Sequence, residues 1–251
     1  MKTQQPMVTV VTALYNSATF IGETIESVLA QSFTDWEMII VDDCSTDNSA
    51  EIAAGYREKD SRIILISLEE NSGAAVSRNK AIEAARGRYI AFLDSDDRWH
   101  PEKLEKQLAF MQKRNFSFTH TWYEKYNEAG KSLGVIVTPP ESMNYKSLLK
   151  SNRIGCLTVI YDTEKLGKVY MPLIRKRQDY GLWLKILKKN IIIHVFPENM
   201  AYYRVRSGSI SENKLEMVKY NWMLYRKVEK FNFFLSVYYL SWNVFRKLRS
   251  S

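Results

Sequence analysis

The chain has 251 residues, of which 45% are hydrophobic and 25% are charged, a composition typical of a globular protein with a full core. Its two cysteines are too few for a disulfide framework, and no secretory signal pattern opens the sequence, so a reducing, cytoplasmic setting is expected. The formal net charge of +8 indicates an anionic partner, which leaves nucleic acid, a lipid surface and a phosphorylated substrate as candidates.

The first hundred residues alternate between predicted strands and helices. Apolar, β-branched segments predict strands at residues 7–16, 36–43, 62–67 and 88–94. Amphipathic spacing and cap-forming residues predict helices between them, at residues 21–32, 44–59 and 73–87. Because parallel strands need crossover connections, this alternation predicts an α/β fold with a mostly parallel sheet and helices on both faces.

The middle of the chain predicts additions to this sheet. A helix is expected at residues 102–115, and the short aromatic segments of residues 116–137 favour an antiparallel addition. A further amphipathic helix at 178–189 precedes two strands, at 191–196 and 200–206.

The last forty residues have a different character. Residues 231–245 carry no charge and are rich in aromatic side chains, and from residue 215 onward seven Lys or Arg stand against two Glu. This segment is shorter than the roughly twenty residues that span a bilayer, but an aromatic helix flanked by cations suits the plane of an anionic membrane surface. Packing on the core or on a second copy of the chain remains the alternative.

Acidic side chains stand at the carboxyl ends of the predicted parallel strands, where open sheets of this kind bind ligands. Asp42 and Asp43 follow the second strand, and Asp94 and Asp96 follow the fourth. Carboxylates this close repel one another, so a cation is expected between them, and hard dications prefer oxygen ligands. A solvated turn or a helix cap is the alternative for the aspartates at 94–97.

Two other function classes lack their sequence patterns. No two of the ten glycines are two positions apart, so neither a dinucleotide-binding fingerprint nor a P-loop is present. No established nucleic-acid-binding motif is present either, and acids would repel phosphate in the predicted cleft, so no nucleic-acid partner is expected.

Taken together, four segments resemble the family 2 glycosyltransferases, which invert the anomeric centre and have the GT-A fold. The segments are "VTVVTALYNSATFIGETIESVLAQSFTDWEMIIVDDCSTDNS", "NSGAAVSRNKAIEAARGRYIAFLDSDD", "RQDYGLWLKI" and "YYRVRSGSIS", in the order the family has them. The resemblance covers most of residues 7–211 and extends to bacterial enzymes that build cell-surface polysaccharides, among them those of teichuronic-acid type.

This resemblance implies a site for a nucleoside-diphosphate sugar. A uracil N3–H donor would suit a carboxylate acceptor, and an arginine would face the phosphates. The residues implied to bind the donor nucleotide are Ala13, Tyr15, Asp42, Asp43, Arg78, Asp94, Ser95 and Arg204. A helix cap is the alternative role for Asp42 and Asp43, and a surface ion pair for Arg78.

The resemblance also implies a metal and a base. Asp96, with Asp94, would bind Mn²⁺ or Mg²⁺, which stabilises the charge of the departing nucleotide. Asp179 would accept the proton of the attacking hydroxyl, or would be a helix N-terminal acid alone. Arg206 stands where family members commonly have His, so its role is left open. The basic run before Asp179 could meet a phosphate of a lipid-linked acceptor or be a solvated surface.

The sequence therefore predicts a glycosyltransferase domain at residues 1–214 and a basic, aromatic helical tail at 215–251. Within the domain, residues 1–100 would bind the nucleotide and 101–214 the acceptor. The predicted activity is metal-dependent, inverting transfer from a nucleoside-diphosphate sugar, expected to be UDP-linked, to a lipid-linked or glycan acceptor. It would take place on the inner face of the cell membrane, with a homo-oligomer possible. A non-catalytic nucleotide-binding module at the membrane surface is the alternative.

Overall fold

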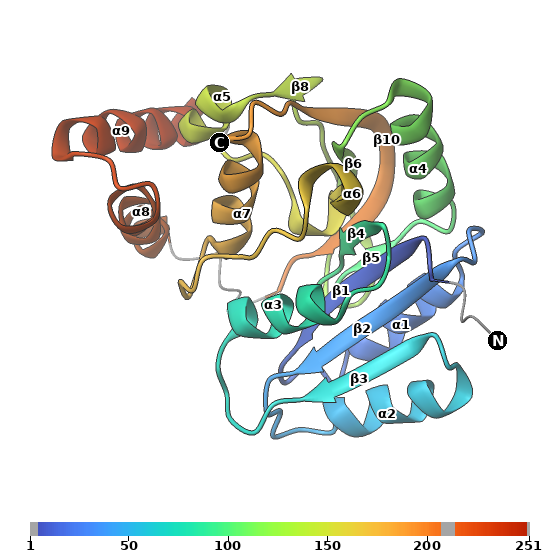
Figure 1. Cartoon of the computed structure of the whole chain (residues 1–251). Coiled ribbons are helices and arrows are strands. Elements are labelled where there is room, and N and C mark those ends of the chain that lie inside the picture. Colours follow the sequence, from blue (N-terminus) through green and yellow to red (C-terminus); the bar gives the residue numbers. More distant parts are fainter. Residues whose placement is uncertain (1–4, 207–213, 250–251) are drawn as a thin grey trace.

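The computed structural model describes residues 5–206 and 214–249, and its described part is organised around one ten-stranded mixed sheet (Figure 1). The first four strands along one side of the sheet are parallel to one another. In spatial order they are β3 (Ile63–Ser67), β2 (Trp36–Asp42), β1 (Val8–Leu14) and β4 (Tyr89–Phe92). This confirms the predicted parallel half of the sheet.

The other side of the sheet is larger and more mixed than the small antiparallel addition that was predicted. β9 pairs antiparallel with both β4 and β6, whereas β6 and β10 are parallel to each other. These strands are β5 (Arg98–Trp99), β6 (Phe118–Tyr126), β7 (Ser132–Val137), β8 (Ser142–Met143), β9 (Ile160–Asp162) and β10 (Ile193–Arg204). The two strands predicted at 191–196 and 200–206 form one strand, β10, because irregular pairing at Phe196–Ala201 lets it continue along β6.

Helices cover both faces of the sheet. Neighbouring strand residues such as Val10 and Val11 belong to separate apolar clusters, because successive side chains point to opposite faces. One cluster lies beneath α1 (Ile21–Leu29), α2 (Ser49–Lys59) and α4 (Lys103–Arg114). The other lies beneath α3 (Ala74–Ala84), α5 (Tyr145–Lys150), α6 (Thr163–Leu166) and α7 (Gln178–Leu187). A 3₁₀ turn at Cys156–Thr158 contacts β4, β6 and β10.

A buried carboxylate fixes the turn that leads into β4. Glu37 is only 2% exposed, and it accepts hydrogen bonds from the Thr9 hydroxyl at 2.7 Å and the Arg86 amide at 2.7 Å. Gly87 follows, and a Cβ on it would lie 2.5 Å from the Thr9 amide nitrogen. The chain can approach β1 this closely only with glycine, and β4 then delivers the aspartate cluster to the carboxyl edge.

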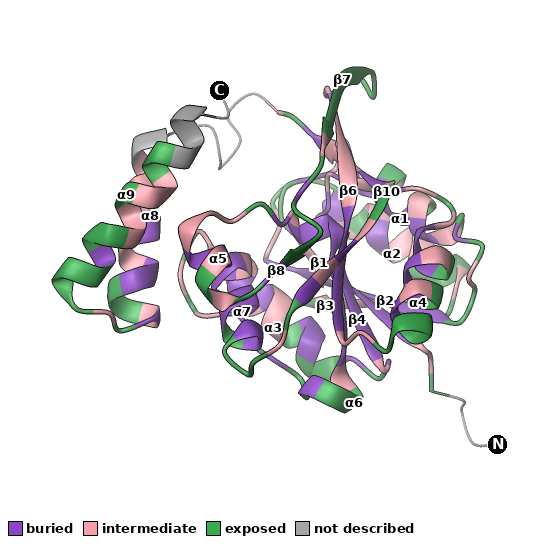
Figure 2. Ribbon diagram, turned by 90° about the horizontal axis from the view of Figure 1, so that it is seen from above, coloured by how far each residue is buried: buried purple, intermediate pink, exposed green. Residues whose placement is uncertain are grey.

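The end of the chain is helical and packs on the core. It forms α8 (Lys214–Met223), a π-helical turn (Leu224–Val228) and α9 (Phe233–Arg249). Asn243 of α9 donates to the Leu149 carbonyl at 3.0 Å, and the Tyr225 hydroxyl donates to the same oxygen at 2.8 Å. One face of α9 is thereby held against α5, while its first turn stays exposed (Figure 2). Among the described residues, no helix has both the length and the apolar character to cross a membrane.

Candidate functional site

A cavity of about 1910 Å³ opens at the carboxyl ends of the parallel strands. Its walls come from segments far apart in sequence: the ends of β1 and β4, the start of α3, the loop before the 3₁₀ turn, the start of α7, the end of β10, and α8 and α9. Nine of the predicted site residues line it, namely Ala13, Tyr15, Asp43, Arg78, Asp94, Ser95, Asp96, Asp179 and Arg204. Asp42 does not line it.

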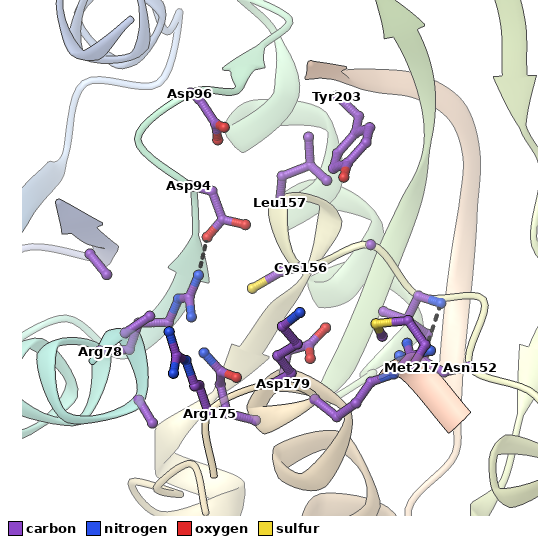
Figure 3. Close-up of a pocket in the computed structure, with 18 of the residues that line it drawn as sticks. Arg78, Asp94, Asp96, Asn152, Cys156, Leu157, Arg175, Asp179, Tyr203 and Met217 are labelled. Atoms are coloured by element: carbon purple, nitrogen blue, oxygen red, sulfur yellow. Dashed lines mark hydrogen bonds and ion pairs between the residues drawn. The ribbon is translucent and has the colours of Figure 1, made fainter. Parts of the chain in front are cut away.

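Each aspartate of the predicted metal pair is matched with an arginine. Arg78 Nη2 lies 2.5 Å from Asp94 Oδ1, and Arg206 Nη1 lies 2.9 Å from Asp96 Oδ2. Figure 3 shows Asp94 and Asp96 one above the other on the same wall, with Arg78 reaching Asp94 from α3. Burial raises the pKa of Asp96, the negative charge of Asp94 raises it further, and Arg206 partly opposes both effects. Positive charge on this wall therefore favours the ionised form of Asp96.

The same pair suits a hard dication. Among the described residues, Asp94 Oδ2 and Asp96 Oδ1 accept no hydrogen bond, so each carboxylate keeps one oxygen for another cation. Mg²⁺ and similar ions are commonly bound by one or two carboxylates together with substrate phosphates. Within the described residues no three His, Cys, Asp or Glu side chains gather closely enough to hold a metal by themselves. A diphosphate would have to complete the ligand set.

The third aspartate of the cluster has a structural position. Asp97 is 1% exposed and does not line the cavity; its Oδ1 accepts the Arg204 amide at 2.7 Å. Burial raises the pKa of Asp97 well above its ordinary value, and the charges of Asp96 and Asp94 add to the effect. It therefore joins the end of β4 to the end of β10.

The geometry does not fit the predicted contact between Arg204 and the diphosphate. The Arg204 side chain is fully buried and packed between the rings of Phe20 and Tyr126. Its three guanidinium nitrogens already donate within the protein, to the Asp96 carbonyl, the Glu128 carbonyl and Glu23, each at 2.8 Å. Sequence matching identified the right segment but could not reveal burial. Arg206, two residues on, is the partly exposed arginine at this wall.

Asp42 and Asp43 hold two loops at the carboxyl edge. Asp43 is 3% exposed and accepts the amides of Ser72 and Gly73, each at 2.8 Å, which fixes the start of α3 beside the cavity. Asp42 accepts the hydroxyl of Ser45 at 2.5 Å and lies outside the cavity, so the donor contact implied for it is not supported. It holds the loop before α2 but does not cap that helix, whose N-cap is Asn48.

Tyr15 and Ser95 lie on opposite sides of the strand ends. Tyr15 is 48% exposed and lines the cavity, which leaves a face of its ring available for stacking. Ser95 is 7% exposed, and its hydroxyl donates to Ser17 Oγ at 3.0 Å, so it supports the neighbouring loop as well as facing the cavity. Ala13, at the end of β1, adds no side-chain bulk beside Tyr15.

Asp179 stands at the first turn of α7. Figure 3 shows it across the cavity from the Asp94 and Asp96 wall. Arg177, the residue just before α7, adopts a left-handed conformation with φ of 67°, and the chain turns into the helix there. Burial raises the pKa of Asp179, and the nearby positive charge of Arg177 and the Tyr180 amide partly oppose this rise. A carboxylate with a raised pKa is suited to accept a proton near neutral pH.

The cavity also holds cations that the site prediction omitted. Arg153, Arg175 and Arg177 line it, as does Arg206. The basic run containing Arg175 and Arg177 was noted in the sequence as a possible phosphate contact. Arg153 carries no motif and is brought to the cavity only by the fold.

Comparisons with known proteins match the chain to one family of enzymes. Residues 9–169 match the profile of "Glycosyl transferase family 2". The chain is 49% identical over 229 residues to TuaG of Bacillus subtilis, named as a teichuronic acid biosynthesis glycosyltransferase, covering 91% of each chain. It is 40% identical over 220 residues to an Escherichia coli UDP-Glc:alpha-D-GlcNAc-diphosphoundecaprenol beta-1,3-glucosyltransferase, covering 86% of this chain and 84% of the relative.

Solved structures support the fold. The S. aureus TarS complex with UDP-GlcNAc matches with a TM-score of 0.71 at 23% identity, covering 93% of this chain and 70% of that one. A mannosyltransferase of Pyrobaculum calidifontis, solved with GDP-Man and Mn²⁺, matches with a TM-score of 0.63 at 18% identity, covering 88% of this chain and 63% of that one. These likenesses show a shared GT-A-like fold.

Proposed function

The chain belongs to glycosyl transferase family 2 and is a glycosyltransferase, and from this premise we propose that it transfers a sugar, with inversion, from a UDP-sugar to a lipid-linked acceptor in cell-envelope polysaccharide synthesis. The observation that carries the proposal is the single cavity that holds Tyr15, Asp43, Asp94, Asp96 and Asp179 together.

The donor nucleotide would lie along the ends of β1 and β2. The exposed ring of Tyr15 can stack on a uracil, and Ala13 leaves room for the base. Each Asp43 oxygen already accepts one backbone amide, but a carboxylate oxygen has a second lone pair, so the carboxylate can still accept the uracil N3–H. The named UDP donor of the Escherichia coli relative supports this choice of nucleotide.

The diphosphate would lie against the Asp94 and Asp96 wall. These two side chains would hold Mn²⁺ or Mg²⁺, which when bound offsets the charge that develops on the leaving nucleotide. Arg78 and Arg206, the two cations already on this wall, can turn toward phosphate oxygens, because guanidinium groups pair well with them. Arg204 would act indirectly, since its hydrogen bond to the Asp96 carbonyl helps to hold the wall in place.

Asp179 would act as the base. In an inverting transfer the acceptor hydroxyl attacks from the side opposite the departing diphosphate, so the base has to stand across the cavity from the phosphates. Asp179 lies there, and the raised pKa makes it a stronger proton acceptor than an ordinary aspartate. The N-terminal position on the rigid helix α7 would keep its carboxylate oriented.

The beginning of α9 suits a membrane surface. Phe233 and Phe234 are 57% and 82% exposed, and the exposed cations Arg226, Lys227 and Lys230 stand just before them. Aromatic side chains next to cations favour the interface of an anionic bilayer. We therefore propose peripheral attachment at the inner face of the cell membrane, which would bring the cavity to a lipid-linked acceptor.

A panel of UDP-sugars tests the proposal. With Mn²⁺ and a short-chain lipid-diphosphate acceptor, one UDP-sugar should yield a glycosylated lipid and free UDP. Asp179→Asn should form no product while UDP binding persists. Failure of every nucleotide sugar to give product or to raise the melting temperature would contradict the proposed function.

A further inference from the structure

The cavity extends well beyond the space that a UDP-sugar requires. Besides the residues assigned to the donor and the base, its lining includes residues 151–157 and 173–177, parts of α8 and α9, and residues 135–137 of β7. Neither the donor nucleotide nor the proposed base accounts for this part. We refer to it as the outer cavity.

Three arginines line the outer cavity, and one of them, Arg177, is close enough to Asp179 for its charge to lower the pKa of that carboxyl. The three are Arg153, Arg175 and Arg177, and none of them forms a salt bridge within the part of the chain that the structure describes. Arg177 Nε is buried and has no hydrogen-bond partner there, although a buried polar atom without a partner is costly. Like charges held this close repel one another. An anion with several negatively charged oxygens would relieve both costs.

Exposed apolar side chains line the same cavity. Leu173, next to the basic run, is 73% exposed, although leucine is usually buried. On β7, Val135 and Ile136 are 45% and 52% exposed, and Val244 on α9 is 40% exposed. All four line the cavity, and Figure 2 shows β7 as an exposed strand that projects beyond the body of the sheet. The outer cavity thus pairs an anion-binding centre with an apolar border.

An isoprenoid diphosphate combines the same two chemical features, two adjacent phosphates and an apolar chain. We propose that Arg153, Arg175 and Arg177 bind the diphosphate of an isoprenoid-linked acceptor, and that Leu173 and the facing side chains of β7 and α9 receive its first isoprene units. The inference rests on the proposed function, because it assumes a sugar acceptor beside Asp179.

The spacing along the chain agrees with this acceptor. Arg177 is only two residues from Asp179, and Figure 3 shows Arg175 and Asp179 at the same end of the cavity. In a monosaccharide-diphosphate lipid, a single sugar ring separates the diphosphate from the attacking hydroxyl. A diphosphate site next to the base is therefore what such an acceptor requires.

Calorimetry with the full chain tests the site separately from the donor site. The protein is first saturated with UDP and Mn²⁺, so that added phosphate cannot occupy the donor position. Farnesyl diphosphate is then titrated, with farnesol and inorganic pyrophosphate as reference probes. Farnesyl diphosphate should bind at least about tenfold more tightly than either reference, because only it offers both phosphates and an apolar chain.

Charge-reversal variants complete the test. Arg153→Glu and Arg175→Glu should each weaken farnesyl diphosphate binding about tenfold or more, and leave UDP affinity within about twofold. Lys113→Glu, on the far helix α4 and outside the cavity, is the matched control and should change neither affinity. Melting temperatures establish that each variant is folded.

Several outcomes would overturn the inference. Unchanged farnesyl diphosphate binding in both folded variants, Arg153→Glu and Arg175→Glu, would place the lipid elsewhere. Farnesol binding as tightly as farnesyl diphosphate would remove the role of the arginines, and equal binding of pyrophosphate would remove that of the apolar border. If the unmodified protein failed to bind UDP at all, the proposed function itself would be contradicted. Failure of the lipid site and failure of the proposed function are therefore distinguishable.

Discussion

Arg206 Nη1 lies 2.9 Å from Asp96 Oδ2, so a side chain of the protein already neutralises the aspartate that is proposed to bind the dication. Both groups are about one-third exposed, and the arginine also lies over the Phe20 ring at 4.9 Å. A guanidinium and a metal ion favour the same carboxylate. Dication binding at Asp96 should therefore compete with this ion pair.

Replacing Arg206 tests this competition. Arg206→Ala removes the competing charge, so the affinity of the nucleotide-free protein for Mn²⁺ should rise about threefold to tenfold. Turnover with UDP-sugar should fall, because a cation facing the leaving diphosphate is lost. Electron paramagnetic resonance of free Mn²⁺ measures the affinity, and Lys113→Ala serves as the control. A weaker Mn²⁺ affinity in Arg206→Ala would show that the arginine supports the metal site.

Asp179 should govern the acidic limb of the pH profile. Because burial raises its pKa, the carboxylate gains a proton at a higher pH than an ordinary aspartate, and kcat should decline below that pH. Asp179→Asn should lower kcat by a factor of about a hundred or more, with UDP affinity retained. Steady-state rates across pH and UDP titration measure both effects. An acidic limb unchanged in Asp179→Asn would contradict the base assignment.

The same substitution should stabilise the protein at neutral pH. The pKa of Asp179 in the folded state lies above the ordinary value of 3.8, so the folded state binds this proton more tightly than the unfolded chain does. The stabilising effect is present below 3.8 and is lost as the pH rises through the folded-state pKa. Asp179→Asn should thus raise the melting temperature at pH 7, with the gain shrinking toward pH 3. A lower melting temperature at pH 7 would show that the ionised carboxylate is stabilised by its surroundings.

Arg204 should contribute to stability more than to donor binding. Arg204→Ala leaves the carbonyls of Asp96 and Glu128 without their donors, Glu23 without its ion-pair partner and the buried Asp97 without a nearby positive charge, which should cost about 3–5 kcal/mol of unfolding free energy. Denaturant unfolding measures the loss, with Arg62→Ala on a more exposed ion pair as the control. A variant of normal stability that has lost UDP affinity would restore the diphosphate role expected from the sequence.

The beginning of α9 should control attachment to vesicles. Phe234→Asp, at the most exposed aromatic residue of the helix, should reduce sedimentation with anionic liposomes about tenfold, because a charge replaces an apolar group at the interface. Ile192→Asp, at another exposed apolar residue that does not line the cavity, is the control. Equal sedimentation of both variants and the unmodified protein would favour an interface between copies of the chain.

Local sequence patterns were sufficient to predict the parallel half of the fold. Strands such as β1 and β2 are buried, mostly apolar runs. In a helix such as α1, the buried residues recur on one face. β9 was missed because it has only three residues and no alternation of its own, although it joins the two halves of the sheet. Its position depends on pairing with β4 and β6, which are distant in sequence.

The acidic residues of the site could be predicted, because they stand directly after the predicted parallel strands. The roles of the arginines could not be predicted, because they depend on how deeply each side chain is buried. Arg204 and Arg206 are two positions apart on the chain, yet one is enclosed between two rings and the other faces the cavity. The position of Arg153 in the cavity could not be predicted from the sequence either, because only the fold of residues 151–157 brings it there.

The most direct test of the metal-assisted donor site is calorimetric titration of UDP into the full chain, once with Mn²⁺ and once with chelator, for the unmodified protein and for Asp96→Asn. The unmodified protein should bind UDP at least about tenfold more tightly with Mn²⁺, and Asp96→Asn should lose that difference. Equal UDP affinity with Mn²⁺ and with chelator in the unmodified protein would contradict the account.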